Sequence, residues 1–134
     1  MFKSLSKYSD VGLFIGRLGI GAIFIVFGWR ELSAGQDTWA RVGRAIGSLG
    51  IHFQPILWGL LAAIAEFGGG ILLILGLLFR LAAAILAFTM FVGLVSAFRA
   101  GPHDFADYSR PLEMLCIAVV FLFVGPGKYS VDRG

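Results

Sequence analysis

A single charged residue, Glu66, lies near the middle of an apolar run from Ile56 to Phe79. A hydrocarbon core about 30 Å thick requires roughly 20 helical residues, so a run of this length can cross a membrane. A charged side chain at the centre of such a helix costs about 2.5 to 3.5 kcal/mol on insertion scales, and it normally faces a partner or a wet cavity. The run therefore predicts a membrane helix that carries a buried acidic site.

The composition of the whole chain agrees with a membrane protein. Hydrophobic residues make up 58% of the 134 residues and charged residues only 14%, which leaves too little polar surface to cover a soluble domain. The net charge of +3 is spread without a Lys/Arg cluster, so we expect the lipid bilayer as a partner and no nucleic acid. The single cysteine, Cys116, excludes an internal disulfide, a CxxC pair or an iron–sulfur site within one chain. Electron transfer would therefore require a bound cofactor, a quinone or a partner protein.

The apolar segments predict an all-α membrane protein, a four-transmembrane-helix antiparallel bundle forming one domain over residues 1–134. The predicted spans are residues 8–29, 56–79, 81–98 and 111–124, and only Arg80 separates the second from the third, which indicates a tight hairpin. Within the polar segment 30–54, apolar residues recur at helical spacing from Trp39 to Leu49. This pattern is typical of an amphipathic helix at the membrane interface.

The four spans place both long polar connections on one side of the membrane and both termini on the other. Lys and Arg are equally numerous on the two sides, so the positive-inside rule does not decide the orientation. Lys3 and Lys7 precede the first span, which usually dominates, and they favour cytoplasmic termini.

Arg17 is the candidate partner of Glu66. Arg17 lies nine residues into the first predicted span and Glu66 ten residues into the second, which puts each about 13–15 Å below its own membrane surface. Since neighbouring spans enter from opposite faces, both side chains are expected near the midplane. Two interpretations stay open: a structural ion pair that fixes the helix register, or a site that relays a proton or contacts a ligand.

A second polar group is expected at the face of the long connections, and its candidates are His52, His103, Asp104, Arg110 and Glu113. Glu113 follows Arg110 by three residues, which predicts a local salt bridge. The two histidines lack any recognised ligand spacing, so no metal or haem site is predicted.

Several short motifs follow one another along nearly the whole chain. They are Arg17-Leu18-Gly19, Gly28-Trp29, Glu66-Phe67-Gly68-Gly69-Gly70, Leu75-Gly76-Leu77, Arg80, and the tail from Gly125 to Asp132. Together they resemble the DoxX-like family of small bacterial inner-membrane proteins. The resemblance implies a multi-pass protein of the inner membrane with four helices. Members of that family are associated with oxidoreductase systems, including a quinone-linked thiosulfate-oxidising subunit and partners in oxidative-stress defence. The resemblance also marks Arg17, Glu66, Gly68, Gly69, Gly70 and Arg80 as site or structural residues.

Three functions are compatible with these observations. The first is a membrane component of a redox complex, in which a quinone docks between the helices and a partner protein carries the catalytic centre. The second is a small transporter or channel lined by Arg17 and Glu66, which would require a homo-oligomer because four helices enclose a polar path poorly. The third is a scaffold that assembles other membrane proteins. The resemblance favours the first, while catalysis by the chain itself stays open and no catalytic residue is assigned.

Overall fold

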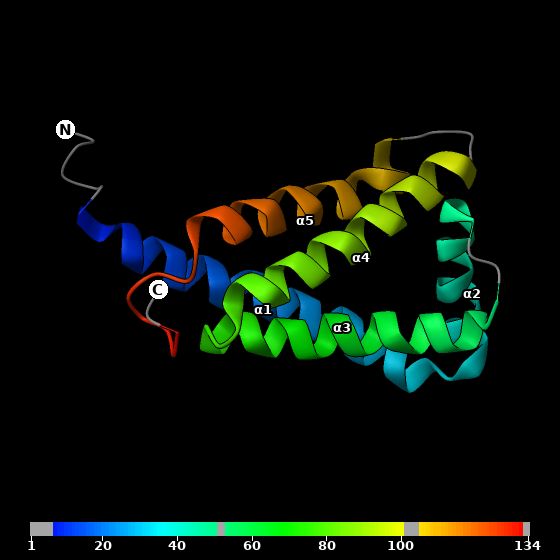
Figure 1. Ribbon diagram of the computed structural model, residues 1–134, viewed down its shortest axis with the longest axis horizontal. Coiled ribbons are helices and arrows are strands. Elements are labelled where there is room, and N and C mark those ends of the chain that lie inside the picture. Colours follow the sequence, from blue (N-terminus) through cyan, green and yellow to red (C-terminus); the bar gives the residue numbers. More distant parts are fainter. Residues whose placement is uncertain (1–6, 51–52, 101–104, 133–134) are drawn as a thin grey trace.

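The computed structural model describes residues 7–50, 53–100 and 105–132, and every regular element in them is helical. In chain order, Figure 1 shows α1 (Ser9–Ala34), α2 (Gln36–Gly43), the 3₁₀ helix η2 (Arg44–Leu49), α3 (Pro55–Leu75), α4 (Phe79–Ala100) and α5 (Phe105–Val124). The predicted all-α class is therefore confirmed.

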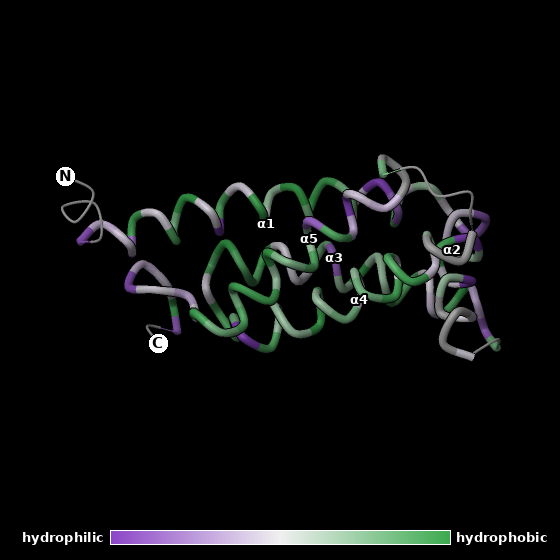
Figure 2. The backbone as a smooth tube through the Cα atoms, turned by 90° about the horizontal axis from the view of Figure 1, so that it is seen from above, coloured by the Kyte–Doolittle hydropathy of each residue, from purple (hydrophilic) through white to green (hydrophobic). Residues whose placement is uncertain are grey.

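Three helices are long and apolar enough to cross a membrane: Ser9–Ala34, Pro55–Leu75 and the segment Phe79–Ala97 of α4. They correspond to the first three predicted spans, although α1 continues past its expected end at Trp29. The fourth predicted span lies in α5, which is not among the three within the described part of the chain. Figure 2 shows hydrophobic residues along the long helices and hydrophilic residues concentrated towards the two ends of the molecule.

Small residues allow α1 and α3 to pack with their backbones in close contact. A Cβ atom added to Gly28 would lie 2.5 Å from the amide nitrogen of Phe67, and one added to Gly21 would lie 2.7 Å from the carbonyl oxygen of Gly70. Only glycine permits such an approach. The earlier residue of α1, Gly21, contacts the later residue of α3, Gly70, whereas Gly28 contacts Phe67. The two helices therefore run in opposite directions.

The amphipathic helix expected between the first two spans is present as α2 together with η2, at one end of the molecule (Figure 1). The α2 segment packs against the start of α3 through a second pair of glycines, with Gly43 beside Pro55 and Gly59 beside Trp39. Trp39 also donates a hydrogen bond from its indole Nε1 to the carbonyl oxygen of Glu31 at 2.8 Å. These contacts fix α2 against the ends of both α1 and α3.

A left-handed glycine ends α3 and begins the hairpin to α4. Gly76 has φ 69°, and its amide donates to the carbonyl oxygen of Leu72 at 2.8 Å, while the amide of Leu77 donates to the same oxygen at 3.1 Å. This is the Schellman pattern, in which glycine is favoured because it has no Cβ to strain. The tight turn predicted between the second and third spans is built in this way.

The tail after α5 folds back onto this hairpin. The amides of Val131 and Asp132 donate to the carbonyl oxygens of Leu75 and Gly76, each at 3.0 Å. The Asp132 carboxylate in turn accepts from the amides of Leu78 at 3.0 Å and Phe79 at 2.8 Å. Asp132 therefore caps the first turn of α4, where amides have no partner within the helix.

Candidate functional site

Arg17 is fully buried, with an exposed fraction of 0%, and it binds main-chain oxygens. Its Nη1 donates to the carbonyl oxygens of Leu73 at 3.3 Å and Ile74 at 3.4 Å, and its Nη2 donates to that of Tyr129. Leu73 and Ile74 belong to the last turn of α3, and the carbonyl oxygens at this end of a helix carry partial negative charge. Arg17 thus joins α1, the end of α3 and the tail.

The predicted pair between Arg17 and Glu66 is wrong. Glu66 precedes Leu73 by seven residues on α3, which separates it from the Arg17 contact by about 10 Å along the helix. Counting residues from the start of each predicted span places the two side chains at the same depth only if the two helices begin at opposite membrane surfaces. Instead, α1 extends to Ala34, and its Gly28 packs against Phe67, the residue after Glu66. Arg17 therefore lies far from Glu66 along α3.

Glu66 pairs with Arg110 of α5. Its Oε1 accepts a hydrogen bond from Arg110 Nη2 at 3.1 Å, and Glu66 is only 2% exposed. The guanidinium of Arg110 also lies 3.7 Å from the ring centroid of Phe27 on α1, a favourable cation–π geometry. The local salt bridge predicted between Arg110 and Glu113 does not form, because Arg110 turns into the bundle while Glu113 is exposed.

A second carboxyl group, that of Glu31, reaches the same point from α1. Glu31 lies in hydrogen-bonding contact with Glu66, and both side chains face one cavity. Sequence reasoning missed this residue because the first span was expected to end at Trp29. The available signal was its spacing, since Glu31 follows Gly28 by three residues and shares its face if the helix continues.

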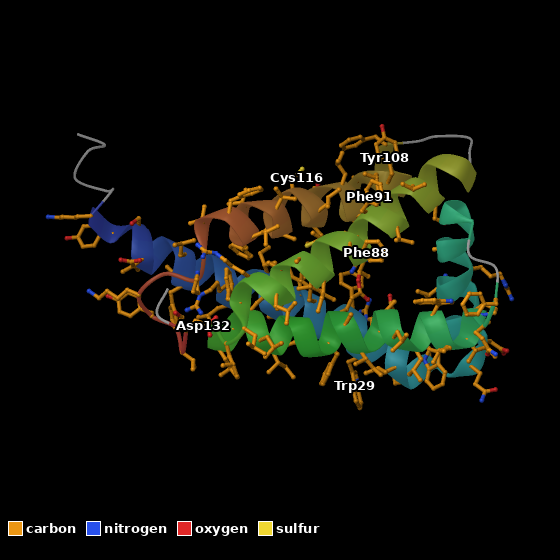
Figure 3. The ribbon with its side chains drawn as sticks, in the orientation of Figure 1. Trp29, Phe88, Phe91, Tyr108, Cys116 and Asp132 are labelled. Atoms are coloured by element: carbon orange, nitrogen blue, oxygen red, sulfur yellow. The ribbon has the colours of Figure 1, made fainter. Side chains whose placement is uncertain are left out.

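The cavity beside these charges has a volume of about 300 Å³. It lies between α3, α4 and the α2–η2 segment, and its walls are mostly apolar. Trp58 of α3 and Phe88 of α4 supply aromatic surface, and Thr89 adds a hydroxyl group. Figure 3 labels Phe88. That hydroxyl donates to the carbonyl oxygen of Ile85 at 2.9 Å, so it is left as a hydrogen-bond acceptor.

Four buried polar atoms in residues that line this cavity have no hydrogen-bond partner in the described part of the protein. Two are donors, Trp58 Nε1 and Arg110 Nε, and two are carboxyl oxygens, Glu31 Oε2 and Glu66 Oε2. Buried polar atoms without partners are costly and uncommon, so their concentration around one cavity indicates a binding site.

The remaining predicted residues divide between packing and the surface. Gly69 packs against Leu86 and Gly70 against Gly21, whereas a side chain at Gly68 would meet open space. Arg80 is exposed in the first turn of α4, and it makes no hydrogen bond or ion pair within the described residues. Three further predicted site residues, His52, His103 and Asp104, lie outside the described residues. Within residues 7–50, 53–100 and 105–132, no group of three His, Cys, Asp or Glu side chains is placed to hold a metal ion.

The sequence is similar to those of known membrane proteins. A sequence model of the DoxX family matches residues 12–99, a range that contains Glu31 and Glu66 but ends before Arg110 and the tail. The inner membrane protein YqjF of Escherichia coli K12 is 27% identical over 132 residues, which cover 96% of this chain and 95% of that protein. No solved structure matches the chain significantly.

Proposed function

Because this chain belongs to the DoxX family and is an integral membrane protein, we propose that it is the membrane component of a quinone-linked oxidoreductase or oxidative-stress system in a bacterial inner membrane. The cavity beside Glu66 binds the quinone ring, and a partner protein supplies the electrons. The chain's single cysteine provides no dithiol for that purpose.

The observation that carries this proposal is the set of unpaired polar atoms in an apolar cavity. A volume of about 300 Å³ is at the small end of ligand pockets, which range over about 300–1,000 Å³, and it suits a flat ring better than a bulky molecule. A quinone presents carbonyl oxygens that can accept from Trp58 Nε1 and Arg110 Nε. A quinol presents hydroxyl groups that can donate to the carboxyl oxygens of Glu31 and Glu66, so both redox forms find partners.

We also propose that α5 is a fourth span and completes an antiparallel bundle with cytoplasmic termini. Its support is that Arg110, a charged residue near the start of α5, is paired inside the protein with Glu66. The start of α1 then lies on the same side as the tail, in agreement with the hydrogen bond from the Lys128 amide to Asp10 Oδ1 at 3.1 Å. A Cys116→Ser, Lys128→Cys variant should resist a membrane-impermeant maleimide in intact spheroplasts and react after lysis, whereas labelling of intact spheroplasts would reverse the orientation.

Ligand binding is tested by titrating the purified protein with a decyl-substituted benzoquinone and following tryptophan fluorescence. We expect saturable quenching that is largely lost in Trp58→Phe, since that indole lines the cavity, and retained in the matched variant Trp29→Phe, whose side chain is 59% exposed. Arg110→Lys keeps the positive charge but not the planar donor set, and it should weaken binding by about tenfold or more. Absence of saturation, or equal quenching in both tryptophan variants, would overturn the proposal.

A further inference from the structure

Glu31 of α1 and Glu66 of α3 both line the cavity, and their carboxyl groups lie within hydrogen-bonding reach of each other. Glu66 is 2% exposed, and its Oε1 accepts from Arg110 while its Oε2 has no donor in the described part of the chain. Oε2 of Glu31 likewise has no donor in the described part of the chain. Two ionised carboxylates can only accept hydrogen bonds, so this contact has no hydrogen to join it unless a proton is present.

The charges around the pair lead to the same conclusion. Arg110 on α5 makes the ion pair with Glu66, and Arg41 on α2 is exposed and acts on Glu31 through its charge. The part of α4 that lines the cavity, residues 85–93, contributes no charged side chain. With both carboxyls ionised, Arg110 compensates one negative charge, while Arg41 compensates the other only weakly because it is exposed and screened by solvent. A single added proton makes the group of three neutral, which a low-dielectric environment strongly favours.

We propose that Glu31 and Glu66 share one proton, and that this carboxyl pair is the proton-exchange site of the cavity. Arg110 binds the ionised member, and the shared proton forms the hydrogen bond between the two carboxyl groups. The pair can pass its proton to an oxygen atom of a ligand in the cavity, or take one from it.

The two parts of this proposal rest on different grounds. Proton sharing follows from the contact, the burial and the charges, and it holds whether or not a quinone binds. Exchange with a ligand rests on the proposed function, because the ligand oxygen must reach the cavity. The experiment therefore measures the proton without any ligand first.

The test is infrared spectroscopy of the full chain in lipid nanodiscs at neutral pH, with and without deuterium exchange. A protonated carboxyl group gives a C=O stretch that is distinct from the carboxylate bands and shifts in heavy water. We expect one such band in the unsubstituted protein, lost in both Glu31→Gln and Glu66→Gln. In each variant the remaining carboxylate is compensated by Arg110 and accepts a hydrogen bond from the new amide. The matched variant Glu113→Gln removes an exposed carboxyl from α5 and should keep the band.

Each outcome decides a part of the proposal. A missing band in the unsubstituted protein, or a band that persists in both Gln variants, would overturn proton sharing. Should Glu66→Gln fail to fold, Glu31→Gln gives the same test, because either carboxyl is needed for the shared proton. A band that responds as expected but does not change on adding the decyl-substituted benzoquinone supports the shared proton and refutes exchange with that ligand. Saturable quinone quenching without the band would support the proposed function and refute the carboxyl pair.

Discussion

Replacing Gly28 by alanine should open the site by forcing α1 away from α3. The new Cβ would lie 2.5 Å from the Phe67 amide nitrogen, whereas ordinary contacts begin near 3.4 Å, so the helices must separate by about 0.9 Å. The nearest atoms, Phe67 N and Cα, belong to the backbone and cannot move away by a change of rotamer. Glu31 lies one turn beyond Gly28, and Glu66 directly precedes Phe67, so the displacement acts on the contact between the two carboxyls.

The size of this effect follows from two limits. A hydrogen bond between carboxyl groups spans about 2.5–3.0 Å between its oxygen atoms, so an added separation of about 0.9 Å breaks it. Overpacking of this kind typically costs about 1–3 kcal/mol in the free energy of unfolding. We therefore expect Gly28→Ala both to destabilise the fold by this amount and to shift the protonated-carboxyl band, because the proton loses its hydrogen-bond acceptor.

Denaturant titration of the protein in mixed micelles measures the free energy of unfolding, and infrared spectroscopy measures the band. Gly19→Ala is the matched control on the same helix, because a Cβ there meets no atom within 4 Å. That variant should be neutral or gain about 0.5–1 kcal/mol from the better helix propensity of alanine. Equal stability and equal bands in the two variants would refute the claim that the Gly28 contact sets the geometry of the site.

Three further substitutions test other contacts. Asp132→Ala removes the acceptor for the Phe79 amide at 2.8 Å and should lower the free energy of unfolding by about 0.5–2 kcal/mol in the same denaturant titration. Arg110→Ala leaves Glu66 buried without its cation and should lower the free energy of unfolding by about 3–5 kcal/mol. Adding Glu66→Gln to that variant should recover most of this loss, and no recovery would contradict the ion pair. Gly76→Ala puts a side chain at φ 69° and should cost about 1–2 kcal/mol while exposing the tail to limited proteolysis, with an unchanged cleavage rate as the contrary result.

The apolar runs were sufficient to predict where the membrane helices lie. Pro55 begins α3 one residue before the predicted start, and the Gly76 hairpin falls close to the predicted turn, because proline and glycine mark helix ends through local backbone chemistry. Burial of Glu66 could also be expected, since its neighbours on both sides are apolar. These features depend on short stretches of sequence.

The partners of the buried charges could not be predicted in the same way. Glu66 meets Arg110 and Glu31, which are 44 and 35 residues away along the chain, and the contact depends on how far each helix is shifted against its neighbours. The glycine contacts between α1 and α3 set this shift. Counting residues from a membrane surface cannot predict it. The i,i+3 spacing in the sequence pairs Arg110 with Glu113. In the folded protein Arg110 instead pairs with the buried carboxylate of Glu66.

The tail contact of Arg17 has a consequence for biosynthesis. The carbonyl oxygen of Tyr129 is 112 residues away in the chain, so at about 5–20 residues per second it is made roughly 6 to 22 s after the arginine. During that interval the guanidinium enters the bilayer with the first helix and must be held by water, lipid phosphate or the insertion machinery. The arginine therefore gains its last main-chain acceptor only after all five α-helices described above have been made.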